Sequence, residues 1–109
     1  MKLKQGYFLS ADADNDFAEQ FAYFCEAAGW EVADRFFAAT LAAFDRICAM
    51  PEIGNRRRFN NPVLVNVRVW PIKGFDKYRI FYRPLGNRIE ILRILHAARD
   101  VDAIFEDEG

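Results

Sequence analysis

Residues Val63–Asp100 read VLVNVRVWPIKGFDKYRIFYRPLGNRIEILRILHAARD, and they contain most of the strand-forming signal of this 109-residue chain. Apolar residues alternate with polar or basic ones over Val63–Trp70 and again over Lys77–Arg83, which is the period of a half-buried strand. Pro84–Asn87 has the composition of a hairpin turn. Arg88–Leu95 is apolar on both faces, which is typical of a central strand. The segment therefore predicts three short antiparallel strands.

An N-terminal strand and a first helix are predicted upstream of this segment. Leu3–Ser10 alternates well enough for the strand. Ser10 and Asp12 offer side-chain oxygens to the free amides of a first helical turn. Gly29 fits a left-handed cap at the far end of that helix. The helix between them has an apolar stripe at helical spacing, made of Phe17, Phe21, Phe24 and Ala28.

A second helix is predicted from Glu31 to Cys48. Met50-Pro51 ends it, because the residue before a proline avoids the helical conformation. Only about two residues connect the two helices, so they must form an antiparallel hairpin. We interpret the phenylalanines of both helices as core residues and not as a docking surface. The predicted core stripe of the second helix is Ala33, Phe37, Leu41, Phe44 and Cys48, widened by Phe36 and Ile47.

These elements predict one α+β domain, residues 1–109. Its parts are an N-terminal strand, an antiparallel helix hairpin, a three-stranded antiparallel meander that joins the first strand in one sheet, and a short acidic C-terminal helix within residues 99–107. No segment reaches the roughly 18 apolar residues of a membrane span, and the N-terminus does not resemble a signal peptide. We therefore expect a cytoplasmic protein. Cys25 and Cys48 are expected on the order of 20 Å apart, as buried thiols without a disulfide.

The net charge of −1 conceals a strongly dipolar sequence. Residues 1–52 have a net charge of −5, and residues 100–109 also have −5. Residues 53–99 contain eleven basic and two acidic side chains, a net charge of +9. Such a basic surface favours docking of an acidic partner, because opposite charges steer encounter. The simpler alternative is a sheet face that is merely solvated by arginines.

Motifs for catalysis are missing from the sequence. It has no glycine-rich phosphate loop, no CxxC or HExxH metal motif and no GxSxG nucleophile motif. Ser10 and Thr40 are the only serine and threonine, and both are accounted for by helix positions. His96, the only histidine, is the one candidate general base, and a hydrogen-bonded corner residue is the commoner role at the end of a strand. We therefore expect a protein that is not an enzyme and that needs no cofactor or metal ion.

The remaining chemistry is cationic. Arg68, Arg79 and Arg83 are predicted to point from one face of the sheet, with Lys77 on the same strand face and Arg99 near the strand end. Guanidinium groups bind phosphate or carboxylate in a bidentate manner, so this face suits RNA, DNA or an acidic peptide.

The chain resembles the ParE-type toxins of the RelE/ParE toxin–antitoxin superfamily. The likeness covers nearly the whole length, and its strength lies in the order and spacing of short segments. The final segment, with its Leu-His-Ala-Ala-Arg-Asp run, resembles the ending of the ParE branch. The matching segments are Ala11–Phe24, Ala33–Phe36 with Leu41, Met50–Gly54 with Arg56–Arg58, Val67–Ile72, Gly74-Phe75, Tyr78–Arg83 and Ile94–Asp100.

The resemblance implies a type II toxin that inhibits DNA gyrase by protein–protein binding and is neutralised by a ParD-like antitoxin. RelE-like members instead cleave mRNA on the ribosome, using a sheet arginine that Arg79 matches and usually a C-terminal tyrosine. That tyrosine position falls near Ile104 or Phe105 here, and the acidic ending Glu106–Glu108 would repel a phosphate backbone. Direct nucleic-acid binding is therefore not expected. The alternatives are a RelE-like mRNA endonuclease and a non-toxic member that only binds its antitoxin.

We predict that the antitoxin or the target contacts basic residues of the sheet and of its closing run. These are Arg68, Lys77, Arg79, Arg83, Arg93, His96 and Arg99.

Overall fold

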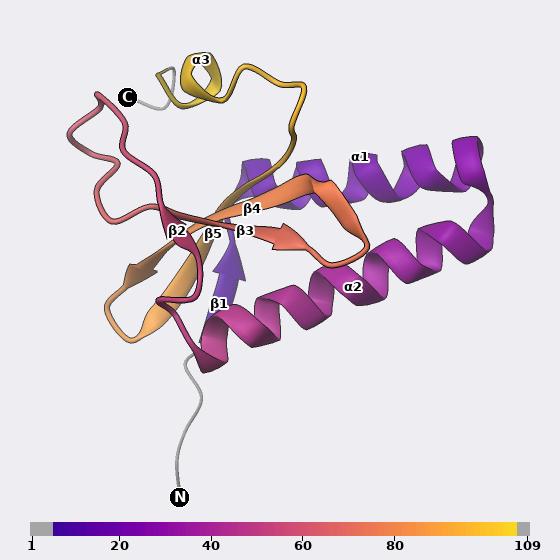
Figure 1. Cartoon of the computed structure of the whole chain (residues 1–109), viewed down its shortest axis with the longest axis horizontal. Helices are drawn as coiled ribbons and strands as arrows, with labels where there is room; N and C mark the ends of the chain where they lie inside the picture. Colours follow the sequence, from indigo (N-terminus) through magenta and orange to yellow (C-terminus); the bar gives the residue numbers. More distant parts are fainter. Residues whose placement is uncertain (1–5, 107–109) are drawn as a thin grey trace, which may run out of the picture.

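A five-stranded sheet forms the centre of the computed structural model, which describes residues 6–106 (Figure 1). The strand order is β1-β5-β4-β3-β2, with β1 parallel to β5 and all other neighbours antiparallel. The predicted α+β fold is confirmed, and Leu3 and Gln5 of the predicted first strand lie outside the described residues. The elements are β1 (Gly6–Leu9), α1 (Ala11–Ala28), α2 (Trp30–Ala49), β2 (Asn55–Arg56), β3 (Arg68–Ile72), β4 (Phe75–Leu85), β5 (Arg88–His96) and α3 (Val101–Glu106).

The two long helices form the predicted hairpin. Ser10 caps α1, because its hydroxyl oxygen accepts a hydrogen bond from the Ala13 amide at 3.0 Å. Gly29 alone separates α1 from α2, and its φ of 94° with ψ of 166° differs from the predicted left-handed helical cap. This backbone conformation is open to glycine and strained for other residues, which explains how a single residue reverses the chain.

The main core lies between this hairpin and one face of the sheet. Phe36 and Phe44 of α2 pack there against Ile80, Tyr82 and the isoleucines of β5. The prediction that Phe37 belongs to this core is wrong, because Phe36 is fully buried while Phe37 is 41% exposed and stacks on Phe17 at the hairpin seam. The buried face of α2 includes the polar residue Thr40, so a search for apolar residues alone did not identify this face. Thr40 can be buried because its hydroxyl donates a hydrogen bond to the Phe36 carbonyl.

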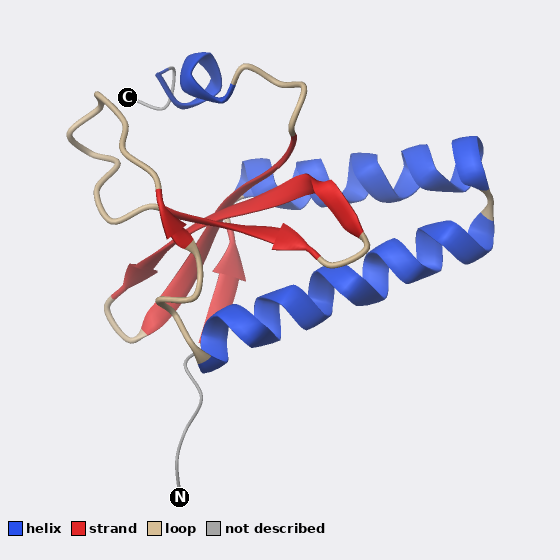
Figure 2. Ribbon diagram, viewed as in Figure 1, coloured by secondary structure: helices blue, strands red, loops and turns tan. Residues whose placement is uncertain are grey.

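A smaller core covers the opposite face of the sheet. It consists of Leu64, Val67, Phe81, Leu95 and Phe105, so residues 57–67 and α3 form a second layer, as Figure 2 shows for the loop beside the short helix. The predicted strand over residues 63–67 is wrong. The Val63 and Val65 side chains are exposed, and β3 begins only at Arg68. Asn66 adopts a positive φ of 60°, which interrupts the extended backbone that the valine alternation indicated.

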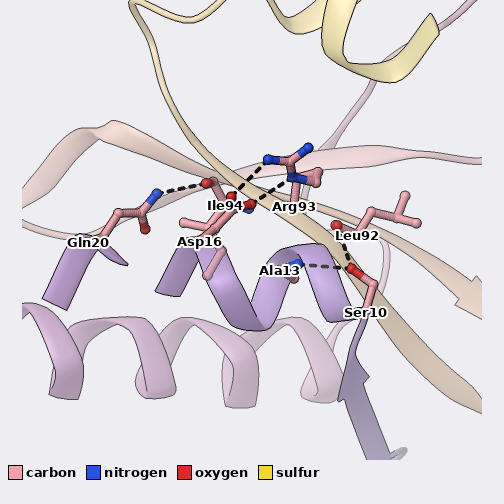
Figure 3. Close-up of polar contacts among 7 residues, drawn as sticks. All are labelled: Ser10, Ala13, Asp16, Gln20, Leu92, Arg93 and Ile94. Atoms are coloured by element: carbon pink, nitrogen blue, oxygen red, sulfur yellow. Dashed lines mark hydrogen bonds and ion pairs between the residues drawn. The ribbon is translucent and has the colours of Figure 1, made fainter. Parts of the chain in front are cut away.

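Side chains of α1 and of its capping residue Ser10 bind the edge of β5 where no strand pairs with it (Figure 3). β1 pairs with β5 only as far as Ile91. Beyond that point, the Ser10 hydroxyl donates to the Leu92 carbonyl at 2.8 Å, and Gln20 Nε2 donates to the Ile94 carbonyl at 2.8 Å. The Asp16 carboxylate accepts the Ile94 amide at 3.0 Å. α1 thus satisfies a strand edge that would otherwise leave backbone groups unpaired.

The buried Tyr82 binds the connector between α2 and β2, residues 50–54, to the sheet. Its hydroxyl donates to the Pro51 carbonyl at 2.8 Å and accepts the Gly54 amide at 2.9 Å. Burial raises the pKa of Tyr82, and the Gly54 amide and the Arg68 guanidinium partly oppose that rise. These contacts bring the chain into β2, a short edge strand that pairs with β3 and that the sequence did not predict.

Cys25 and Cys48 form no disulfide, as predicted, with Cys48 buried and Cys25 half-buried. Across residues 6–106, no helix is long and apolar enough to cross a membrane.

Candidate functional site: a basic cleft

A cleft of about 700 Å³ opens on the sheet face that lies opposite the helix hairpin. Its apolar floor includes Val69 and Phe81, which face each other across β3 and β4. Three arginines and a single carboxylate supply its charges, so the described lining is net basic. The full lining is Asn55, Arg56, Arg57, Val69, Pro71, Asp76, Arg79, Phe81 and Val101.

Two of the three arginines come from the β2 edge and are held in place. Arg57 pairs with Asp102 of α3 at 2.9 Å, and its guanidinium lies over the Phe59 ring at 5.2 Å. Arg56 donates to the Asn66 side chain at 3.3 Å. The sequence prediction did not include either arginine as a binding residue, because only the pairing of β2 with β3 brings them beside the sheet. The sequence feature that could have identified these two arginines is the run of basic residues Arg56–Arg58 after the connector.

Arg79 is the available guanidinium of this cleft. It lies opposite Pro71 on the open face of β4, and its side chain is exposed. Within the described part of the chain, it forms no hydrogen bond or ion pair. A guanidinium in this setting can bind a carboxylate or phosphate through two parallel hydrogen bonds without breaking an existing contact. Lys77 follows the same strand face, as predicted.

The predicted placement of Arg68 beside Arg79 is wrong. The register pairs Arg68 with Tyr82, so its side chain lies on the hairpin side of the sheet. There its guanidinium donates to the Gly54 carbonyl at 2.7 Å and to the Glu52 carbonyl at 3.2 Å. Arg68 therefore fastens the connector and does not line the cleft.

Two other predicted arginines are engaged in structural contacts. Arg83 shares the face of Arg79, but its guanidinium pairs with Glu90 at 2.9 Å and donates to the Val63 carbonyl. Arg93 forms a bidentate ion pair with Asp16, with both contacts at 2.8 Å (Figure 3). Their role in binding stays a prediction, and the structure shows that such binding would compete with these contacts.

His96 and Arg99 lie apart from the cleft, in a smaller pocket on the hairpin side. The His96 Nδ1 atom accepts the Ala98 amide at 3.0 Å, and the ring meets Tyr78 edge-on at 4.9 Å. This is the hydrogen-bonded corner that the sequence indicated. Of the predicted basic residues, Arg79 therefore lines the cleft and His96 and Arg99 line the smaller pocket, while the others line neither.

α3 contains Ile104 and Phe105, which lie near the position of the C-terminal tyrosine of RelE-like members. Phe105 is 1% exposed and packs on Phe59 and Phe81 at 4.6 and 5.3 Å between ring centres. Among residues 6–106, no three histidine, cysteine, aspartate or glutamate side chains gather where they could hold a metal ion.

Comparisons with known proteins agree with this fold. A chain of the chromosomal ParDE toxin–antitoxin system from P. aeruginosa superposes with a TM-score of 0.69 and 18% sequence identity, over 85% of this chain and 96% of that one. A search of curated proteins gave no match. The profile of the family described as ParE toxin of type II toxin–antitoxin system, parDE, matches residues 7–101. Because that span covers most of the sequence, the chain belongs to the family of ParE toxins of type II toxin–antitoxin systems.

Proposed function

We propose that this chain inhibits DNA gyrase by protein–protein binding and is neutralised by a ParD-like antitoxin whose acidic segment occupies the basic cleft. The observation that supports the antitoxin site is the unpaired guanidinium of Arg79 above an apolar floor. A solved relative belongs to a ParDE system, which also favours an antitoxin partner.

An amphipathic acidic segment fits the composition of the cleft. Carboxylates of the segment pair with Arg79 and Arg56, while its apolar side chains cover Val69 and Phe81. Exposed ion pairs contribute only about 0–1 kcal/mol each, so most of the affinity must come from the apolar contact. The charges serve mainly to speed encounter and to select an acidic partner.

The lining of the cleft supports inhibition by binding over RNA cleavage. Its described side chains supply guanidinium, amide, apolar and one carboxylate group, and they include no imidazole, hydroxyl or thiol. A ribonuclease of the RelE kind must activate a 2′-hydroxyl and protonate a leaving group. Arginine stays protonated at ordinary pH and is a poor general base.

Expression of the isolated chain in growing bacteria tests the proposed target. We expect filamentous growth and DNA-damage signalling, and we expect the purified chain to inhibit DNA supercoiling by gyrase. Rapid loss of translation with cleaved mRNA would instead identify an endonuclease. Normal growth together with antitoxin binding would identify a non-toxic member.

The charge-reversed variant Arg56→Glu/Arg79→Glu tests the antitoxin site. We expect antitoxin binding to weaken more than about tenfold in titration calorimetry, which corresponds to about 1.4 kcal/mol. Arg35→Glu makes the same type of charge change at an exposed position of α2 and should change the affinity less than about threefold. Equal effects of the cleft and control variants would show that only overall charge matters. Arg83 is unsuitable for this test, because its substitution also releases Glu90 and Val63.

A further inference from the structure

A second pocket of about 270 Å³ lies where the end of β5 meets α1. Tyr78 and Arg79 are consecutive in β4 and point to opposite faces, so this pocket and the basic cleft lie on different sides of the sheet. The side chains that bring chemistry to the pocket are Glu19, Gln20, Tyr23, Tyr78, His96 and Arg99. Two of them, His96 and Arg99, belong to the Leu-His-Ala-Ala-Arg-Asp run, which does not line the basic cleft.

The corner after β5 directs two hydrogen-bond donors into this pocket. His96 Nδ1 accepts the Ala98 amide, so the proton of the neutral ring is on Nε2. The edge-on contact with Tyr78 fixes the plane of the ring. The Arg99 amide donates to the His96 carbonyl at 3.0 Å, which ties both residues into one turn. Neither His96 Nε2 nor the Arg99 guanidinium has a partner within residues 6–106.

Of the acceptors near these donors, those of Asp16 are occupied and those of Glu19 face water, whereas Gln20 Oε1 is buried and open. Both Asp16 oxygens are held by Arg93 and by the Ile94 amide. Gln20 uses its amide nitrogen on the Ile94 carbonyl, and its buried Oε1 has no partner among the described residues. Glu19 is exposed on the surface of α1. With an imidazole, a guanidinium and two phenols, the pocket therefore has more free donors than acceptors.

We propose that this pocket binds one carboxylate of a partner polypeptide, held between the Arg99 guanidinium and His96 Nε2–H, with the Tyr23 and Tyr78 hydroxyls beside it. The pocket lies below the usual 300–1,000 Å³ of small-molecule sites, which suits a single acidic side chain or a chain terminus. Glu19 makes the site less favourable for a dianion such as phosphate. The proposal does not rest on the antitoxin or on gyrase, and its test uses neither.

The single histidine of the chain makes the test direct, because its ring gives one set of imidazole NMR signals. The full chain is titrated with two small probes, N-acetylglutamate α-amide for a side-chain carboxylate and N-acetylalanine for a terminal one. We expect saturable shifts of the His96 signals with at least one probe, and the tighter probe identifies the source of the carboxylate. Inorganic phosphate is the third titrant and should bind more weakly.

Matched variants separate the pocket from general charge. Arg99→Gln should weaken binding of the better probe about fivefold or more, because it removes the cation of the pocket. Arg35→Gln removes an exposed cation elsewhere and should leave the dissociation constant within about twofold. Amide spectra of each variant check that the fold is retained. Absence of shifts at His96, tighter binding of phosphate than of either probe, or equal effects of the two variants would overturn the proposal.

Discussion

Replacing Asp16 with alanine is expected to lower the free energy of unfolding by about 3 kcal/mol, because it leaves a nearly buried arginine without its carboxylate. The Asp16 and Arg93 side chains are only 10% and 15% exposed, and two hydrogen bonds of 2.8 Å join them. The substitution also removes the acceptor of the Ile94 amide. Breaking such a pair typically costs about 3–5 kcal/mol, and the residual exposure favours the lower end.

Chemical denaturation followed by circular dichroism measures this loss. The Asp12→Ala variant is the control, since Asp12 is an exposed carboxylate in the first turn of the same helix. It should lose only about 0.3–1 kcal/mol, through its interaction with the helix dipole. A loss below about 1 kcal/mol for Asp16→Ala would show that water already screens the pair.

Two partial changes separate the ion pair from the capping of the β5 edge. Arg93→Ala removes the pair but keeps the hydrogen bond between Asp16 and the Ile94 amide. Asp16→Asn keeps a neutral acceptor for that amide while it removes the charge. If edge capping is the larger contribution, Asp16→Ala will be clearly less stable than Arg93→Ala.

Much of the fold could be predicted from local patterns. The Ser10 cap, the two long helices and the alternation of β4 each depend on residues close together in the sequence. They therefore predict structure without knowledge of distant partners. The alternation of β4 places Tyr78, Ile80 and Tyr82 on one face, which meets the main core, and Phe81 on the other, which meets the second core.

The errors arise where distant residues decide the outcome. The alternation around Val65 satisfies the period of a strand, yet Asn66 turns the backbone and Leu64 is needed by the core under α3. The face of Arg68 depends on its register with Tyr82, which no local pattern specifies.

The candidate site was predictable only in part, for a related reason. Arg79 could be named, because the alternation of β4 places it on an open face. The ion pairs of Arg83 and Arg93 could not be predicted. Arg83 meets Glu90 through the pairing of β4 with β5, and Arg93 meets Asp16 of α1, which is 77 residues away along the chain. A basic sequence predicts a basic surface, but the carboxylates that the fold brings close in space decide which cations remain without an ion pair.

Gly54→Ala is expected to lower the free energy of unfolding by about 2–4 kcal/mol, because overpacking of a rigid site adds to the loss of buried hydrogen bonds. A Cβ atom at Gly54 would lie 2.7 Å from the Tyr82 hydroxyl, 2.9 Å from the Tyr82 Cε1 atom and 2.9 Å from the Val69 carbonyl oxygen. A buried ring and a strand backbone cannot move aside as an exposed side chain can. The ring must shift, and its bonds to Pro51 and Gly54 weaken.

Thermal and urea unfolding of Gly54→Ala and Gly6→Ala provide the comparison. Gly6 has no positive φ, and a Cβ atom there would have no heavy atom of the described chain within 4 Å beyond its sequence neighbours. Its substitution should therefore change stability by less than about 0.5 kcal/mol.

Tyr82→Phe removes one of the three close contacts of the Gly54→Ala methyl group but leaves the other two. Gly54→Ala should therefore remain destabilising in the Tyr82→Phe background. Near-wild-type stability of Gly54→Ala would mean that the connector relaxes freely, and then the position of Arg56, two residues further on, would not be fixed by this contact either.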